Sequence, residues 1–292
     1  MASPGERRPL DFRFARRGPA AEIDAALGHV CCETMADRAL LIGINTYPRK
    51  PLSGAVNDVL RVKRALETLF PSSDLAITLL LNGDATRWAI LEGLKKLVDG
   101  VSAGDRLLFY FSGHGMQLDT WDPAAEADGK DEAICPVDID LATGGNAIRD
   151  RELRPLLEKV PAGVSFAFVA DSCSSRDLAK SVGATIDKSL APPPGLRPGR
   201  VVRPLSRAAR EVHVGMISAC SSNGLALEAD FDGHRGGALT QALLSVLHHG
   251  GKDLPLSEIV SRAAGLLVAW GYSQSPSLEG DEMIKSRPLW AL

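Results

Sequence analysis

The chain has 292 residues, of which 45% are hydrophobic, and a formal net charge of −3 at pH 7; this length can bury one large core or two small ones, and this charge argues against general binding to nucleic acid or membranes. No apolar stretch approaches the roughly 18 residues of a membrane-spanning helix. The five cysteines show no paired spacing, which favours a reducing compartment, so we expect a cytoplasmic protein that binds neither nucleic acid nor a membrane.

Residues 1–36 are polar and carry two arginine pairs, so we expect a weakly ordered N-terminal extension with a short helix around 20–27. A single domain is expected over 37–292. Its first part alternates short apolar runs with segments of helical periodicity. We predict strands over 38–45, 77–81, 106–111 and 164–170, helices over 55–70, 86–98 (capped by Asp84) and 150–159, and a long acidic loop over 116–140.

The segment 188–210 differs in composition from the rest of the domain. It holds six basic residues, no acidic residue and five prolines, and proline both removes a backbone donor and fixes φ. We therefore expect an exposed loop there. After it we predict a strand over 212–218, helices over 238–248 and 256–270, and a short final strand over 282–285. Strands that alternate with helices in this way predict an α/β fold, an α/β/α sandwich around a mainly parallel, roughly six-stranded sheet.

Two short segments with side chains suited to catalysis follow the apolar runs 106–111 and 164–170. The first segment is Ser112-Gly113-His114-Gly115, and the second is Asp171-Ser172-Cys173. The carboxyl ends of parallel strands share one edge of the sheet, where open α/β sheets place their sites. A free thiol has a pKa of about 8.5, so a cysteine nucleophile needs a histidine that takes or holds its proton. We predict His114 and Cys173 as a catalytic dyad. The alternative is that both are structural residues of a nucleotide-type α/β domain.

The glycines on either side of His114 allow the backbone to approach a substrate closely. Backbone N–H groups at Gly115 and Cys173 are therefore candidates to bind the oxyanion that forms during acyl transfer. The histidine precedes the cysteine by roughly 50–60 residues, which is the order found in caspases.

These motifs resemble those of metacaspases, a family of caspase-fold cysteine peptidases. The resemblance runs from Asp37 to the C-terminus. Besides the histidine and cysteine segments, it is carried by residues 38–45, 52–58, 128–138, 218–220 and 237–240. It implies the caspase-like form of the α/β/α sandwich, and the abundance of Ala, Arg and Gly suggests a prokaryotic source.

The resemblance also implies a specificity. Metacaspases cut after Arg or Lys, and carboxylates bind that side chain in the pocket beside the nucleophile. Carried over position by position, the pocket residues are Asp58, Ser112 and Asp171. Two carboxylates favour a guanidinium or an ammonium group and reject an acidic side chain. The alternative is that Asp58 caps or hydrogen-bonds a turn and that Asp171 only ends a strand.

Caspase-fold peptidases are commonly cut between the part that bears the cysteine and the part after it. By resemblance, the domain then divides into a large part over 37–187, a processing loop over 188–210 and a small part over 211–292. We expect cleavage within 188–210, by the chain itself or by an upstream protease. The alternative is that this segment is an ordinary solvated connection.

The segment 116–140 holds eight carboxylates against one lysine, a density that suits Ca²⁺. Many metacaspases are activated by calcium, and the resemblance places Asp131 where one ligand is expected. The chain departs from the family elsewhere, because Arg149-Asp150 stands where a pair of aspartates is common, and a cation there repels Ca²⁺. We therefore expect no cofactor, and a solvated acidic loop rather than a calcium site.

The expected function is that of a cysteine endopeptidase that cleaves proteins after Arg or Lys, through a thioester acyl-enzyme, as a regulated zymogen in stress, cell-death or defence signalling. Its expected partners are protein or peptide substrates and an activating protease. Two alternatives are a catalytically inactive caspase-like interaction module and a peptidase of acidic specificity.

Overall fold

The computed structural model describes residues 35–71, 75–120, 130–173, 185–193, 213–220, 225–280 and 282–290. The expected N-terminal extension with its helix around 20–27, and residues 194–210 of the expected loop, lie outside the described residues. Contacts group residues 35–292 into one compact unit. None of the described helices is long and apolar enough to cross a membrane.

A six-stranded sheet forms the centre of this unit, with the strand order β12-β9-β7-β3-β1-β2. Its strands are β1 (Asp37–Gly43), β2 (Leu75–Leu81), β3 (Arg106–Ser112), β7 (Ser165–Asp171), β9 (Gly215–Ser218) and β12 (Ser277–Glu279). All neighbours are parallel except β12, which runs antiparallel to β9. The central strands β3 and β7 are buried from their second residue onward, and Phe109 stacks on Phe168 between them with ring centroids 4.3 Å apart.

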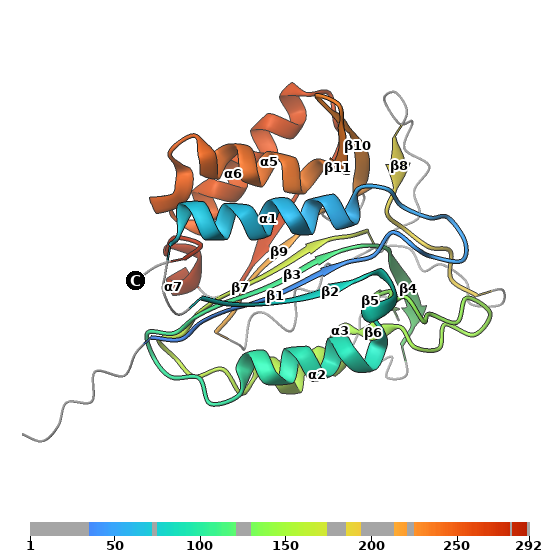
Figure 1. Ribbon diagram of the computed structural model, residues 1–292, viewed down its shortest axis with the longest axis horizontal. Coiled ribbons are helices and arrows are strands. Elements are labelled where there is room, and N and C mark those ends of the chain that lie inside the picture. The colour runs from blue at the N-terminus through green and yellow to red at the C-terminus, as the bar shows by residue number, and fades with distance from the viewer. Residues whose placement is uncertain are drawn as a thin grey trace, which may run out of the picture. The chain divides into compact units, whose positions relative to one another are not determined.

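Helices cover both faces of the sheet, which confirms the caspase-like α/β/α sandwich (Figure 1). One face carries α1 (Ala55–Leu69), α5 (Ala238–His248) and α6 (Leu256–Ala269), and the other carries α2 (Arg87–Val98) and α3 (Asp150–Leu157). Each helix buries an apolar stripe; in α1 the stripe includes Val59, Val62 and Leu66. Thr86 caps α2, since its side chain accepts a hydrogen bond from the Ala89 N–H at 3.3 Å. The expected Asp84 cap is therefore wrong.

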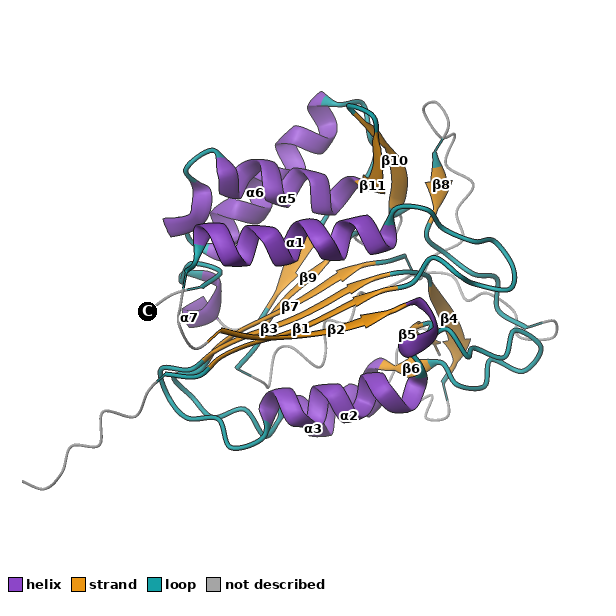
Figure 2. Cartoon of the chain, viewed as in Figure 1, coloured by secondary structure: helices purple, strands orange, loops and turns teal. Residues whose placement is uncertain are grey.

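Two small sheets lie beyond the carboxyl ends of the central strands (Figure 2). One consists of β4 (Gly115–Asp119), β5 (Lys130–Ile134) and β6 (Ile148–Arg149), and the other of β8 (Ile186–Asp187), β10 (Leu227–Phe231) and β11 (His234–Gly237). The expected continuous loop over 116–140 is thus wrong for β4 and β5, whose Met116, Leu118 and Ile134 are buried in the core.

The end of the chain also differs from expectation. Residues Glu282–Lys285 form a short helix, α7, and the last strand is the preceding β12. Four residues with one buried apolar side chain, Ile284, satisfy a helical turn as well as a strand, so periodicity does not separate the two.

Candidate active site

The register of the central sheet brings the two predicted catalytic segments to one edge. Ser112 of β3 is paired with Asp171 of β7, so the segments that follow these residues, with His114 and Cys173, leave the sheet side by side. Both strands are parallel and end at the same level, as the sequence predicted. The candidate site therefore lies at the carboxyl ends of β3 and β7, directly after their last paired residues.

Neighbouring backbone and an aromatic ring hold the His114 imidazole in place. Its Nε2 lies 2.6 Å from the carbonyl oxygen of Lys50, and its ring packs against Tyr47 with centroids 4.6 Å apart. The Tyr47 hydroxyl accepts from the His114 backbone N–H at 3.0 Å and donates to the Cys135 carbonyl at 2.8 Å. Since a carbonyl only accepts, Nε2 carries the ring proton, and the lone pair of a neutral ring is then on Nδ1.

This Nδ1 atom is buried and has no hydrogen-bond partner among the residues that the structure describes. Burial lowers the pKa of His114 from 6.5 to about 4, and the hydrogen bond to the Lys50 carbonyl opposes that shift only in part. The imidazole is therefore neutral at pH 7, with a proton-accepting nitrogen available. This is the form that a general base requires.

Cys173 is fully buried, and its sulfur has a second thiol beside it. The Sγ of Cys220 donates to the Cys173 Sγ at 3.3 Å. Burial and this contact raise the pKa of Cys220 well above its ordinary value, with the contact as the largest cause. Cys220 is therefore held as a thiol and can donate to a Cys173 thiolate.

The two backbone N–H groups predicted to bind an oxyanion converge on one atom. Gly115 N–H donates to the carbonyl oxygen of Lys188 at 3.0 Å, and Cys173 N–H donates to the same oxygen at 3.3 Å. Two donors on one carbonyl are the geometry of an oxyanion hole. The carbonyl that they bind belongs to the peptide group between Lys188 and Ser189, so the chain's own backbone occupies this position.

The side chain of Lys188 fills the predicted specificity pocket. Its Nζ lies 3.2 Å from Asp58 Oδ2 and 3.1 Å from Asp171 Oδ1, and it donates to the Ser112 hydroxyl at 2.9 Å. The three pocket side chains and the Lys188 side chain are fully buried. The structure thus brings together the three pocket residues that the resemblance assigned, and it adds a cation that the sequence reasoning missed.

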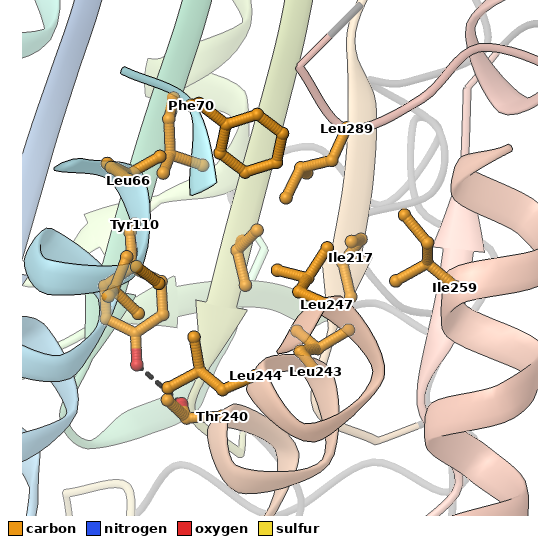
Figure 3. Close-up of a pocket in the computed structure, with 14 residues that line it drawn as sticks. Leu66, Phe70, Tyr110, Ile217, Thr240, Leu243, Leu244, Leu247, Ile259 and Leu289 are labelled. Carbon is orange, nitrogen blue, oxygen red and sulfur yellow. Dashed lines mark hydrogen bonds between the residues drawn. The ribbon is translucent and has the colours of Figure 1, made fainter. Parts of the chain in front are cut away.

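Other groups hold the two carboxylates in the pocket. Gly237 N–H donates to both oxygens of Asp58, at 2.9 and 3.0 Å, while Thr240 donates to Asp171 Oδ2 from its N–H at 3.1 Å and from its hydroxyl at 2.5 Å. Figure 3 shows Thr240 also bonded to the Tyr110 hydroxyl, at the edge of an apolar cavity of about 40 Å³. The Thr240 hydroxyl thus links the Asp171 carboxylate to the Tyr110 hydroxyl.

The charges in the pocket depend on one another. Burial raises the pKa of Asp58, and the Lys188 ammonium opposes that increase. Burial alone disfavours the ammonium of Lys188, but Asp171 and then Asp58 outweigh this and raise its pKa above 10.5. The lysine is therefore protonated at neutral pH, and it is the counter-ion of the pair.

The segment around Lys188 crosses the site as an extended strand. Ile186 and Asp187 pair antiparallel with Glu228 and Leu227 of β10, the Lys188 N–H donates to Ala226 O at 2.9 Å, and the Leu190 N–H donates to Gly115 O at 2.9 Å. Lys188, Ser189 and Leu190 are buried. The expectation of an exposed loop from residue 188 is wrong for these three residues, because backbone pairing and a buried ion pair hold them in the site.

Asp131, the calcium ligand suggested by the resemblance, is paired with two arginines. Its carboxylate is fully buried and accepts from Arg149 at 2.5 Å and from Arg151 at 2.5 Å. A Ca²⁺ ion would have to displace two guanidinium groups, and no group of three or more potential metal ligands occurs in the part of the chain that the structure describes. These residues do not fit the calcium site suggested by the family resemblance. The expected solvated acidic loop is also wrong at this residue.

The contributors to the site that the sequence did not identify by residue include Lys188, Thr240 and the Lys50 carbonyl. For Lys188 there was a signal, since two buried carboxylates require a cation and the lysine begins the segment expected to be cleaved. A backbone carbonyl leaves no mark in a sequence. Ser174, Asp177 and Lys180, near the expected nucleophile, lie outside the described residues.

The parallel sheet, the histidine and cysteine at its edge, and the carboxylate pocket define the class of caspase-like cysteine peptidases. Comparison with known proteins gives the family of the part that holds His114 and Cys173: residues 37–181 match the metacaspase, peptidase C14 domain. The chain is 36% identical to "Metacaspase-7" of Arabidopsis thaliana over 167 residues, which cover 55% of this chain and 40% of the relative. It is 32% identical to "Metacaspase-5" of Trypanosoma cruzi (strain CL Brener) over 266 residues, which cover 85% of this chain and 58% of the relative.

The chain thus spans less than two thirds of the length of these curated relatives. Among solved structures, protein GSU0716 from Geobacter sulfurreducens superposes with a TM-score of 0.63 and 22% identity, covering 88% of this chain and 99% of that one. This likeness supports the fold.

Proposed function

We propose that the chain is a cysteine endopeptidase that cleaves after Lys or Arg, and that it is made as a zymogen whose first substrate is its own Lys188–Ser189 bond. The observation that supports this is the pose of Lys188. Its side chain lies between two carboxylates while its carbonyl oxygen accepts from Gly115 and Cys173 N–H groups. A peptide group held at both points is positioned as a substrate is for acyl transfer.

The proposed reaction uses the tautomer that the Lys50 carbonyl imposes on His114. The Cys173 thiol passes its proton to His114 Nδ1 as the sulfur attacks the Lys188 carbonyl carbon, and the resulting oxyanion is bound by the two N–H groups. His114 then protonates the Ser189 nitrogen, the C–N bond breaks, and a thioester remains. Water, deprotonated by His114, breaks the C–S bond and releases a Lys188 carboxylate.

The pocket favours lysine and arginine for the same electrostatic reason. An ammonium group compensates Asp58 and Asp171, whereas an acidic side chain would add a third negative charge to a fully buried site. An intact chain fills its own pocket, so other protein substrates enter only after Lys188 leaves. Processing is therefore the regulating step.

The test follows the purified full-length chain, its Cys173→Ala variant and its Lys188→Arg and Lys188→Ala variants by intact mass and by N-terminal sequencing. We expect the wild type and Lys188→Arg to yield a fragment that begins Ser189-Leu190, and the other two variants to stay intact at this bond. Peptides that end in Lys or Arg should then be hydrolysed, and peptides that end in Asp should not.

Mixing Cys173→Ala with active chain separates self-cleavage from an upstream protease. Cleavage only within the active molecules indicates an intramolecular step; a chain that is stable alone and is cut by a second protease assigns activation to that partner. If the Lys188–Ser189 bond stays intact and none of the peptides is hydrolysed, the proposal is overturned and an inactive interaction module is favoured.

A further inference from the structure

Lys50 contacts the residues on both sides of Lys188 in the segment that crosses the site. Its Nζ forms an ion pair with Asp187, the residue before Lys188, and donates to the carbonyl oxygen of Ser189, the residue after it, at 2.9 Å. The Ser189 contact is to backbone and is available to any peptide in the site. The Asp187 contact is to a side chain, and it can therefore distinguish one substrate from another.

The Asp187 carboxylate is held tightly in this position. Its Oδ1 also accepts from the Ser189 N–H at 3.2 Å and from the Ser189 hydroxyl at 2.5 Å. Although burial alone would raise the pKa of Asp187, the hydrogen bond from Lys50 and those from Ser189 lower it overall. The side chains of Lys50 and Asp187 are 37% and 33% exposed, so a free peptide can reach this position without the deep burial that Lys188 requires.

Lys50 is fixed by the frame of the site. Its own carbonyl accepts a hydrogen bond from His114 Nε2–H, and its backbone has a φ of 57°, a left-handed conformation that is uncommon outside glycine and asparagine. The nearby turn is bonded to β10, because the buried Glu228 carboxylate accepts from Ser53 N–H and from Gly54 N–H at 2.8 Å. Strand β10, which pairs with the segment before Lys188, and Lys50, which contacts the Asp187 side chain, are therefore held together by these hydrogen bonds.

We propose that Lys50 is a specificity-determining residue that selects an acidic side chain immediately before the basic residue at which the chain is cut. The preferred substrates are proteins with Asp-Lys, Glu-Lys, Asp-Arg or Glu-Arg before the scissile bond. This proposal rests on the proposed function. It restricts the preferred cleavage sites from every Lys or Arg to those that directly follow Asp or Glu. A partly exposed ion pair corresponds to a preference of about three- to tenfold in kcat/KM.

The test uses the self-processed full-length chain and fluorogenic peptides that end in Ile-Asp-Lys, Ile-Ala-Lys or Ile-Lys-Lys. The wild type should hydrolyse Ile-Asp-Lys about three- to tenfold faster than Ile-Ala-Lys, with Ile-Lys-Lys slowest. Lys50→Glu should reverse the order of the acidic and basic peptides. The matched control is Lys63→Glu, a charge reversal on the exposed face of α1, which should leave the order unchanged.

Self-cleavage provides a second readout that does not depend on added peptide. Asp187→Lys should slow the first-order cleavage of the intact chain, and adding Lys50→Glu to the same chain should restore part of the rate, which a purely structural role would not do. Equal hydrolysis of the three peptides by the wild type would overturn the assignment of Lys50 while leaving the proposed function intact. Failure to hydrolyse any lysine peptide would overturn the proposed function instead.

Discussion

Replacing Lys188 by methionine tests whether the buried lysine is the counter-ion of the pocket. Methionine keeps an unbranched apolar stem and removes the charge, so Asp58 and Asp171 face one another without compensation. Removing one partner of a buried ion pair typically costs about 3–5 kcal/mol, because the remaining charge stays desolvated. We expect a loss of this size in the free energy of unfolding at pH 8.

The pH dependence makes the test specific. Burial raises the pKa of Asp58, and removal of the opposing ammonium raises it further. A carboxyl whose folded pKa lies above its unfolded value contributes stability when protonated, and this contribution is lost as pH rises through the folded pKa. The penalty of Lys188→Met should therefore shrink as pH falls from 8 toward 5.

The assay is equilibrium unfolding in urea, with Cys173→Ala in every chain so that no molecule is cleaved during the measurement. Lys63→Met is the matched control, since its partner Glu67 is on the exposed face of α1, where such a pair contributes about 0.5 kcal/mol or less. A loss below about 1 kcal/mol for Lys188→Met, equal at pH 5 and pH 8, would refute the assignment of Lys188 as the pocket's counter-ion.

Three further predictions concern the catalytic groups and the carboxylates around them. Cys220→Ala should retain self-cleavage within about tenfold in rate, since this thiol only donates to Cys173, whereas Cys220 as the nucleophile would give complete loss. The self-cleavage rate, plotted against pH, should keep its plateau down to about pH 5 with a midpoint near 4, because burial lowers the pKa of His114 to about 4; a midpoint near 6.5 would contradict a buried base. A chelator should leave the rate unchanged, because two arginines hold Asp131, and restoration by added Ca²⁺ would contradict this.

Much of the fold could be read from the sequence because its signals are local. The apolar runs that became β3 and β7 end in turn residues, and the parallel direction of these two strands follows from the crossover that contains α3. The β4–β5 hairpin was missed because carboxylates interrupt its apolar positions. Glu132, for example, is buried beside Ala133 and Ile134 although its side chain is acidic.

The residues of the site also fall into those that could be predicted from sequence and those that could not. His114 and Cys173 were predicted from strand ends, and the three pocket residues from family resemblance. The occupant was not predicted, because Lys188 and Asp58 meet only when the chain closes a long loop, 130 residues apart in sequence. A lysine before a proline-rich basic stretch has the local features of an exposed residue, and only the pair of buried carboxylates indicates otherwise.

The position of Lys188 in the chain has a consequence for the cut protein. The proposed cleavage after Lys188 would separate β7 from β9 in sequence, but the two strands are paired along four residues of the same sheet, which would hold the fragments together. The fragments should therefore migrate apart on a denaturing gel and together in a native one. In the proposed cut form, Lys188 would remain covalently joined to the fragment that carries Cys173, so its new carboxylate end would compete for the pocket as a product of the reaction. Under the proposed function, an incoming protein would have to displace this product end, so sequences that bind weakly would be cut slowly.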